Sequence, residues 1–157
     1  MASIYETKNF IVESFETPHV TRSDGGHLRI IPKLPIVDRT ALTPEQAIEF
    51  MRLTVVVGEA FKTAMAKQGI ELVRVNYQDM GNWAFKKDAQ PVFHMHIYGR
   101  AKDAKYQHYK EAVQLPDRST GFYDKFEPLN DQDAALIKEE IEKIFRKEKY
   151  DDKNWKL

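Results

Sequence analysis

Apolar residues recur at helical spacing in two stretches of the chain, and the longer one runs from Thr43 to Gln68. Thr43 suits the N-cap, Pro44 suits the first helical position, and Gln46 completes a capping box with Thr43. Gly69 follows at the point where a left-handed residue would end a helix. The pattern therefore predicts a long helix whose apolar face holds Ala47, Ile48, Met51, Val55, Gly58, Phe61 and Met65.

The second helical stretch lies near the C-terminus. Asn130 suits the N-cap, and Asp131 and Asp133 place negative charge at the positive end of the helix dipole. We expect a helix over residues 130–148 with a solvated face of Lys and Glu and an apolar face of Ala134, Ile137, Ile141, Ile144 and Phe145. Trp155, in the polar tail, is expected to dock on the body of the protein or on a partner subunit.

Strand patterns precede and separate the two helices. The clearest are Leu28–Ile31, Ile70–Tyr77 and Val92–Tyr98, the last started by Pro91 and stopped by Gly99. Weaker candidates are Ile4–Glu6, Phe10–Phe15 and Phe122–Phe126, while residues 79–89 read as a loop and 99–120 as a long polar segment. This order predicts an α+β fold in which two main helices pack on one face of an antiparallel sheet.

Composition excludes several classes of function. The length of 157 residues suits one domain, 1–157, and no repeat, low-complexity tract or linker divides it. Lys and Arg total 24, as do Asp and Glu, so the formal net charge is zero. Proteins that bind nucleic acids or anionic membranes carry a large excess of basic residues, so we expect neither as a partner. The absence of cysteine excludes disulfides, thiolate catalysis and Cys-ligated zinc.

The N-terminal residues show no targeting signal. Met1 to Phe10 include Glu6 and Lys8 and lack the apolar core of a secretory signal. No stretch approaches the ~18 apolar residues of a transmembrane helix. We therefore expect a cytoplasmic protein.

The predicted strand Val92–Tyr98 carries the residues with the most chemistry. Side chains alternate faces along a strand, so His94, His96 and Tyr98 share one face, while Phe93, Met95 and Ile97 point into the core. The polar row could be half-buried and simply hydrogen-bonded, it could ligate a metal through His94 and His96, or it could perform nucleophilic or acid–base chemistry. Periodicity alone does not choose among these readings.

Two motifs that bracket the long helix resemble those of the histidine triad (HIT) superfamily. Residues 90–98, Gln-Pro-Val-Phe-His-Met-His-Ile-Tyr, resemble the signature Gln-x-φ-x-His-φ-His-φ-His-φ, in which φ is apolar. Residues 26–33, Gly-His-Leu-Arg-Ile-Ile-Pro-Lys, resemble the family's Gly-His strand that ends in Pro-Lys, and Leu42 to Glu45 match its Leu-Thr-Pro-Glu helix start. The resemblance covers about residues 10–100 and implies a HIT-like fold.

The resemblance implies a nucleotide hydrolase or nucleotidyl transferase. By position, His96 is the nucleophile that attacks phosphorus and becomes transiently nucleotidylated, and His94 holds the tautomer of His96 largely through its main-chain carbonyl. The implied substrates are dinucleoside polyphosphates or nucleoside phosphoramidates, and no cofactor is required. Tyr98 replaces the third histidine, which contacts the phosphate and the leaving-group oxygen in the family. A phenol, with a pKa of about 10, is a poorer proton shuttle at neutral pH.

Further nucleotide contacts are implied by the same resemblance. Asn82, in preference to Gln78, matches the amide that binds phosphate, Gln90 matches a phosphate-contacting Gln, and His19 falls where a ribose-contacting Asn or Asp is common. His27 is expected to support the site structurally rather than to catalyse, and His108 is expected on the surface. The residues that could add positive charge near the phosphate are Lys86, Lys87 and Arg100.

Two alternative functions and the oligomeric state remain open at this point. The replacement at Tyr98 allows a catalytically weak or inactive nucleotide-binding protein of the HIT fold, and the pair His94 and His96 allows a metal-binding protein. HIT proteins are usually homodimers built on the long helix and part of the sheet. The run Val55, Val56 and Val57 gives that helix more apolar surface than one buried face needs, so we expect a homodimer.

Overall fold

Five antiparallel strands form one open sheet in the computed structural model, which describes residues 3–157. The spatial order is β1-β2-β3-β5-β4, and the register pairs each strand with its neighbours in antiparallel fashion. The strands are β1 (Ser3–Glu6), β2 (Phe10–Ser14), β3 (His27–Pro32), β4 (Leu72–Asp79) and β5 (Met95–Ala101). The helices are α1 (Pro44–Lys67), α2 (Asp131–Phe145) and the short α3 (Asp152–Trp155). The predicted α+β class is confirmed.

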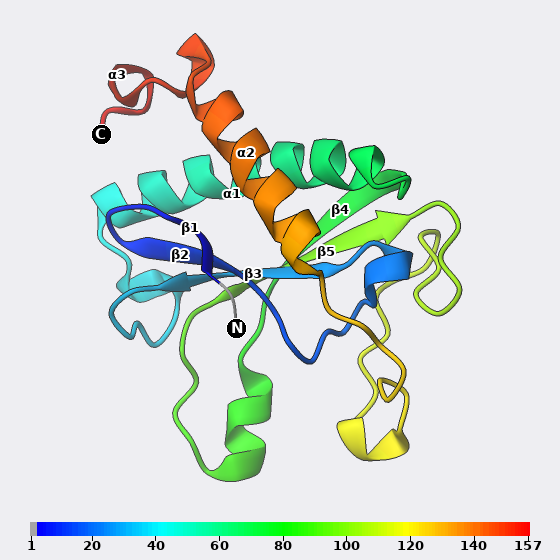
Figure 1. The fold of residues 1–157 in the computed structure, drawn as a ribbon. Coiled ribbons are helices and arrows are strands. Elements are labelled where there is room, and N and C mark those ends of the chain that lie inside the picture. The colour runs from blue at the N-terminus through cyan, green and yellow to red at the C-terminus, as the bar shows by residue number, and fades with distance from the viewer. Residues whose placement is uncertain (1–2) are drawn as a thin grey trace.

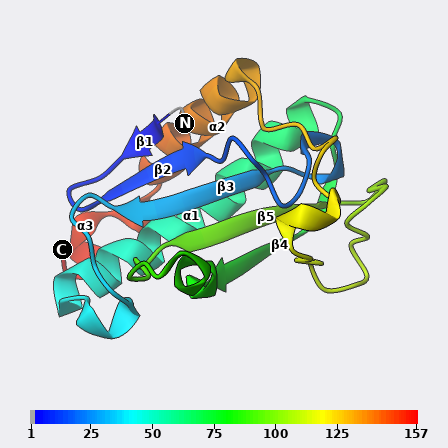
Figure 2. The ribbon, with the colours of Figure 1, turned by 90° about the horizontal axis from the view of Figure 1, so that it is seen from below.

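The two long helices and the long loops lie on opposite sides of this sheet. Figure 1 shows α1 and α2 above the strands, whereas the loops with the short 3-10 turns 82–87 and 118–120 hang below them. Seen from below, the 82–87 turn lies in front of the sheet (Figure 2). The helices cover the apolar face of the sheet, on which Val12, Leu28, Ile30 and Ile97 are fully buried. Val57 and Phe61 of α1 and Ile141 of α2 are fully buried on the helix side of the core. The other face is left to the loops.

Both long helices begin where their capping residues predict. The Thr43 hydroxyl accepts the backbone N–H of Gln46 at 3.2 Å, and the Gln46 side chain accepts the Thr43 N–H at 2.9 Å. Asn130 accepts the N–H of Asp133 at 2.9 Å, and the buried Asp133 carboxylate accepts from Arg22 Nε at 2.6 Å. The second helix is shorter than expected, since its last residue is Phe145.

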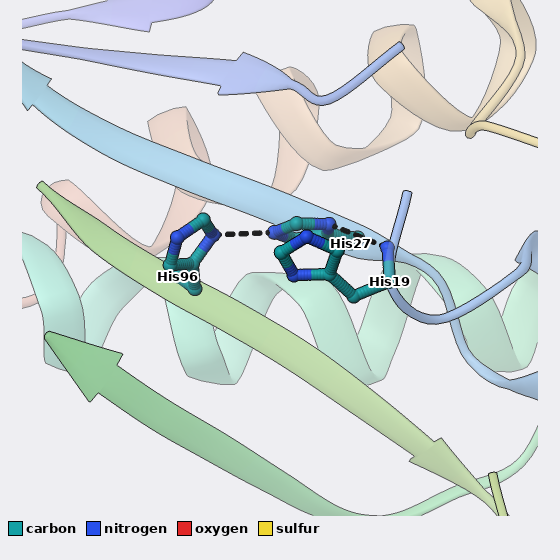
Figure 3. Close-up of side chains that lie close together, drawn as sticks. All are labelled: His19, His27 and His96. Atoms are coloured by element: carbon teal, nitrogen blue, oxygen red, sulfur yellow. Dashed lines mark hydrogen bonds between the residues drawn. The ribbon is translucent and has the colours of Figure 1, made fainter. Parts of the chain in front are cut away.

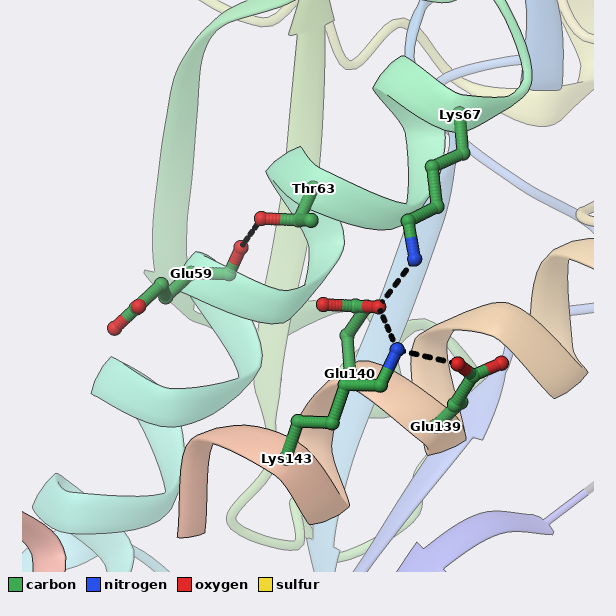
Figure 4. A network of polar contacts seen from close by, with 6 residues as sticks. All are labelled: Glu59, Thr63, Lys67, Glu139, Glu140 and Lys143. Atoms are coloured by element: carbon green, nitrogen blue, oxygen red, sulfur yellow. Dashed lines mark hydrogen bonds and ion pairs between the residues drawn. The ribbon is translucent and has the colours of Figure 1, made fainter. Parts of the chain in front are cut away.

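Charged side chains join α1 to α2 at one end of their contact (Figure 4). Glu140, which is buried, accepts hydrogen bonds from Lys67 Nζ at 2.6 Å and Lys143 Nζ at 3.1 Å.

Farther along the chain, the Trp155 indole stacks on Tyr150 and donates Nε1–H to the carbonyl of Lys149 at 2.9 Å. Trp155 is also partly buried against the hydrophobic core, so the expectation that it docks on the body of the protein is confirmed.

Two strand predictions need correction. Phe122–Phe126 is a turn rather than a strand, and its aromatic rings pack on one another instead of joining the sheet. Strand β5 begins at Met95 and continues past Gly99 to Ala101. Gly99 is needed there for a close backbone approach, because a Cβ atom on it would lie 2.3 Å from the carbonyl oxygen of Gly25.

Within residues 3–157, no helix combines the length and the apolar character that crossing a membrane requires.

Candidate active site

Imidazole rings gather on the face of the sheet that the helices leave open. The β3–β5 register places His27 opposite Tyr98 and Arg29 opposite His96. His19 comes from the loop after β2, and Figure 3 shows it beside His27 and His96. The ring centroids are 5.0 Å apart for His19 and His27 and 4.9 Å apart for His27 and His96. Three separate segments of the chain thus meet at one cluster.

A chain of hydrogen bonds fixes where the imidazole protons lie. The backbone N–H of His19 donates to Nδ1 of His27 at 3.1 Å, so a neutral His27 carries its proton on Nε2 and donates it to Nδ1 of His96 at 2.8 Å. On the other side, Nδ1–H of His94 donates to the carbonyl of Val92 at 2.7 Å. Nε2 of His94 therefore accepts from Nε2–H of His96, 2.9 Å away. The main-chain carbonyl of His94, which was expected to hold the tautomer of His96, takes part in none of these hydrogen bonds.

Burial keeps these rings neutral. It holds the pKa of His27 and of His96 well below the ordinary value, with repulsion among the neighbouring imidazoles adding to the effect. Burial likewise lowers the pKa of His19 to about 4. All three imidazoles are therefore neutral at pH 7, each with one ring nitrogen protonated and the other carrying a lone pair.

Tyr98 lies beneath this cluster rather than at a ligand surface. Its side chain is fully buried, and its hydroxyl lies 2.7 Å from Nδ1 of His19. Burial raises the pKa of the phenol well above its ordinary value, so Tyr98 stays protonated and donates to His19. This geometry does not support the expected contact of Tyr98 with phosphate or leaving group.

A cavity of about 530 Å³ opens over the imidazoles. Its walls combine the aromatic rings of Phe15 and Trp83 with the cationic side chains of Arg29, Lys87 and Arg118, and no carboxylate is among the described residues that line it. The remaining lining residues are Thr17, His19, Met80, Gly81, Asn82, Ala84, Val92, His94, His96 and Leu115. The cavity therefore favours a ligand that combines an aromatic group with an anionic group.

The two arginines of the cavity are held in place by specific contacts. Arg29 lies 4.4 Å above the Phe15 ring and donates from Nε to Glu13 at 2.9 Å. Arg118 donates to the carbonyl of Thr17 at 2.7 Å and lies over the Tyr123 ring at 4.9 Å. Both guanidinium groups are thus fixed before a ligand arrives, which lowers the entropy cost of binding an anion.

The structure brings part of the predicted set to this cavity. His19, Asn82, Lys87, His94 and His96 line it. His27 lies directly beneath, buried and bonded to His96, as a supporting residue would. His108 is exposed, as expected.

Other predicted contacts lie elsewhere. Arg100 is buried and binds Asn76 Oδ1 and the carbonyl of His108, both at 2.7 Å, so it ties loops together instead of facing a phosphate. Gln90 is exposed outside the cavity, and Lys86 pairs with Asp117. Gln78 is adjacent to His96 in the β4–β5 register but does not line the cavity, and its buried Oε1 has no partner among the described residues.

Phe15, Arg29 and Arg118 are cavity residues that sequence reasoning missed. Arg29 carried a usable signal, because it is two residues from His27 and strand alternation places both on one face. Arg118 lies in the polar segment between β5 and α2, where no pattern distinguishes it from surface charge.

The cluster does not fit a metal ion well. Nitrogen atoms of His19, His27 and His96 lie within 4.8 Å of one another, which is close enough to consider a shared cation. However, Nδ1 of His27 accepts a backbone N–H and its Nε2 carries a proton, so neither nitrogen offers a lone pair. In the pair His94 and His96, the hydrogen bond between the two Nε2 atoms likewise occupies the lone pair that a metal ion would need.

The fold is shared with solved structures of HIT proteins. No protein-family model matches the chain, and no curated protein matches it. A hypothetical histidine triad nucleotide-binding protein from Sulfolobus tokodaii superposes with a TM-score of 0.56 at 17% identity, over 93% of this chain and 87% of that one.

Two further structures give the same result. A Hit-like protein involved in cell-cycle regulation from Bartonella henselae has a TM-score of 0.56 at 17% identity, over 89% of this chain and 87% of its own. A zinc-bound histidine triad family protein from Mycobacterium smegmatis has a TM-score of 0.56 at 21% identity, over 92% and 87%. With the strand order and the imidazole cluster described above, these likenesses show that the chain has the fold of the histidine triad proteins.

Proposed function

We propose that this protein is a nucleotide hydrolase or nucleotidyl transferase that cleaves dinucleoside polyphosphates or nucleoside phosphoramidates through a covalent adduct on His96. The main support for this proposal is that a neutral His96 lines a cavity whose other lining residues include aromatic and cationic side chains. The products would be a nucleoside 5′-monophosphate and the released leaving group.

The cavity suits a nucleotide in size and in chemistry. A volume of about 530 Å³ falls within the range that small-molecule sites occupy. Phe15 and Trp83 offer ring faces on which a base can stack, and Arg29, Lys87 and Arg118 offer charge to a phosphate. Asn82 adds an amide that can bind a phosphate oxygen.

His96 is the proposed nucleophile because it is neutral and oriented. Its Nδ1 accepts from Nε2–H of His27 at 2.8 Å, so attack through Nε2 requires that this atom first lose its proton and its hydrogen bond to Nε2 of His94, 2.9 Å away. The bond formed is Nε2–P, and the bond broken is the P–O or P–N bond to the leaving group. Water then attacks the same phosphorus and releases the monophosphate.

This reaction needs no metal or other cofactor, and that is part of the proposal. Arg118 and Lys87 supply positive charge to the cavity, whereas the charge of Arg29 is balanced by the buried Glu13. Elemental analysis of the purified protein tests this point. Stoichiometric zinc would contradict it and would favour the alternative in which His94 and His96 bind a metal.

A second candidate, a nucleotide-binding protein without turnover, is favoured by the burial of Tyr98. Because the Tyr98 hydroxyl is directed to His19, the third position of the motif presents no proton donor to the cavity. Tight binding of a mononucleotide without release of product would support this candidate over the enzyme.

The deciding experiment measures product release from both substrate classes. We expect nucleoside monophosphate to form from a dinucleoside polyphosphate or from a nucleoside phosphoramidate, and we expect His96→Ala to abolish its formation. The exposed His108 gives a matched control in His108→Ala, which should retain turnover. Release by His96→Ala at the rate of the unmodified protein would reject His96 as the nucleophile.

We also propose that two copies of the chain associate through α1 and β4. Strand β4 is an edge of the sheet, and an apolar groove beside it is lined by Leu42, Phe50, Met51, Val55, Tyr77 and Met95. Met51 is 55% exposed and Tyr77 44% exposed, which a second copy would cover. Light scattering should give the mass of a dimer, and Met51→Glu should shift it toward a monomer. A monomeric mass for the unmodified chain would contradict the proposal.

A further inference from the structure

We propose that Arg118 determines which substrates this site accepts, by binding a second anionic group of the substrate in addition to the phosphoryl group that meets His96. Dinucleoside polyphosphates carry such a group, whereas phosphoramidates of simple amines do not. The inference rests on the proposed function and narrows it, since it chooses between the two substrate classes that the function leaves open. Arg118 lies in the segment between β5 and α2, to which the sequence motifs assign no part in binding.

The first observation is positive charge that the protein itself does not balance. Three cationic side chains line the cavity, and one of them, Arg29, is neutralised by the buried carboxylate of Glu13. No ion pair within residues 3–157 includes Lys87 or Arg118, the other two. The cavity thus holds two uncompensated positive charges in a chain whose formal net charge is zero. A ligand with at least two negative charges balances them.

The second observation is that Arg118 is prepared to bind an anion. One of its N–H groups donates to the carbonyl of Thr17 at 2.7 Å. Its guanidinium lies 4.9 Å from the centroid of the Tyr123 ring and 5.8 Å from that of the Trp83 ring. A guanidinium has five N–H donors, and within the described residues only the bond to Thr17 uses one of them. The other donors are held at the cavity wall, where they can form paired hydrogen bonds with phosphate oxygens.

The third observation is the place of Arg118 relative to the proposed nucleophile. The centroid of the His19 ring is 5.3 Å from that of His96 and 5.4 Å from that of Trp83, the ring beside which Arg118 lies. Burial lowers the pKa of His19, and the nearby charge of Arg118 adds to the effect. The wall of the site thus runs from His96 through His19 to Trp83 and Arg118. A group bound by Arg118 is therefore a different group from the phosphoryl group at His96.

The two substrate classes differ at this second position. A nucleoside phosphoramidate of a simple amine carries its negative charge at the attacked phosphorus, and its leaving group has no anionic group. A dinucleoside polyphosphate carries negative charge on every phosphate, so the phosphates of its leaving group supply the second anion for Arg118. The buried Tyr98 agrees with this choice. Its hydroxyl donates to His19 rather than to the cavity, and a departing phosphate, unlike a departing amine, needs no proton from it.

The first test measures binding rather than turnover. Isothermal titration calorimetry with AMP and with ADP, in EDTA at constant ionic strength, gives the gain in affinity from a second phosphate. We expect ADP to bind the unmodified protein about tenfold more tightly than AMP, Arg118→Gln to remove the difference, and Arg118→Lys to keep part of it. The control Arg146→Gln removes an exposed arginine at the end of α2, on the other side of the sheet, and should keep the difference. An unchanged preference for ADP in Arg118→Gln would overturn the inference.

The second test compares turnover of a dinucleoside tetraphosphate with turnover of a phosphoramidate of the same nucleoside. For Arg118→Gln we expect the KM of the tetraphosphate to rise about tenfold, while the KM of the phosphoramidate changes less than about twofold. Arg118→Lys should recover part of the loss, because it keeps the charge but not the paired hydrogen bonds. Equal changes for the two substrates would mean that Arg118 only shapes the cavity, and they would overturn the inference.

The outcomes separate the inference from the function on which it rests. If the unmodified protein turned over neither substrate, the proposed hydrolysis would be rejected, whereas an Arg118-dependent preference for ADP would still support the second anion site. If the unmodified protein had the higher kcat/KM on the phosphoramidate, the proposed hydrolysis would stand and the choice of polyphosphates would be overturned. Matching urea midpoints for Arg118→Gln and Arg146→Gln show that a raised KM does not come from unfolding.

Discussion

The hydroxyl of Tyr98 lies 2.7 Å from Nδ1 of His19, across 79 positions of the sequence. Because the phenol donates this hydrogen bond, a neutral His19 carries its remaining proton on Nε2. His19 lines the cavity, so this hydrogen bond fixes the tautomer of a cavity residue. A residue that reads as a defect in the motif therefore orients a histidine from another part of the chain.

Removing this hydroxyl should destabilise the protein. In Tyr98→Phe, Nδ1 of His19 would stay buried without its donor, which costs about 1–3 kcal/mol. Urea unfolding should show this loss as a lower midpoint with an unchanged slope. Tyr109→Phe is the matched control, since Tyr109 is 37% exposed and its change should leave the midpoint within error. Equal midpoints for the two variants would contradict the structural role of the Tyr98 hydroxyl.

The buried imidazoles should make stability depend on pH. Burial depresses the folded-state pKa values of His19, His27 and His96, whereas each would titrate near 6.5 in the unfolded chain. Below pH 6.5 the unfolded state therefore binds protons that the folded state does not, so the free energy of unfolding falls as the pH falls. This contribution is fully present above the unfolded-state pKa.

The expected size of the effect is about 1.4 kcal/mol per pH unit for each buried histidine, before other groups titrate. Urea unfolding at pH 7, 6 and 5 measures it. His27→Gln, whose amide can still accept from the His19 N–H, should make the dependence less steep between pH 6 and pH 5. A free energy of unfolding that does not change from pH 7 to pH 5 would contradict the neutral, buried state of the cluster.

The fold was largely predictable because its signals are local. The capping box of Thr43 and Gln46 and the alternation of His94, Met95 and His96 each depend on residues within a few positions of one another. Such patterns fix where an element begins and which face it buries. The two long helices and the polar face of β5 were found in this way. The buried face of α1 was not, because Ala47 and Met51 were expected on it and are exposed, whereas Phe50 and Leu53 are buried.

The rest of the site depends on contacts that no local pattern encodes. The partner of Tyr98 is His19, and the segment that brings Leu115 and Arg118 to the cavity is anchored by Asp24, more than 80 positions earlier. Tyr98 illustrates the limit, because the motif fixed its position in the strand but not the direction of its hydrogen bond.

Asp24 should be essential to that anchored segment. Its fully buried carboxylate accepts the backbone N–H groups of Lys105, Tyr106 and Gln107 at 2.7–2.8 Å. Asp24→Asn replaces one acceptor oxygen with an NH₂ group that faces a backbone donor, so we expect a loss of about 3 kcal/mol in the free energy of unfolding. The segment 102–117 should also become more sensitive to limited proteolysis. The exposed Asp103 supplies a control in Asp103→Asn. Cleavage at the same rate in Asp24→Asn and the control would count against the anchoring role.

Trp83 should contribute to nucleotide affinity through its ring. It lines the cavity, and its environment is cationic, with Lys86 Nζ at 4.8 Å and the Arg118 guanidinium at 5.8 Å from the ring centroid. Stacking of a base on an aromatic side chain contributes about 1–3 kcal/mol, so Trp83→Ala should raise the Kd for a nucleoside 5′-monophosphate by ~5–150-fold. Isothermal titration calorimetry with AMP and with GMP measures this change.

The same turn supplies the control that isolates stacking from loop disruption. Phe85 belongs to residues 82–87 as Trp83 does, but it is 65% exposed and is not among the described residues that line the cavity. Phe85→Ala should therefore leave the Kd nearly unchanged, while both variants unfold at similar urea concentrations. If Trp83→Ala and Phe85→Ala weakened binding equally, the effect would belong to the turn as a whole. The base would then have to stack on Phe15, the other aromatic wall of the cavity, and Phe15→Ala would carry the loss.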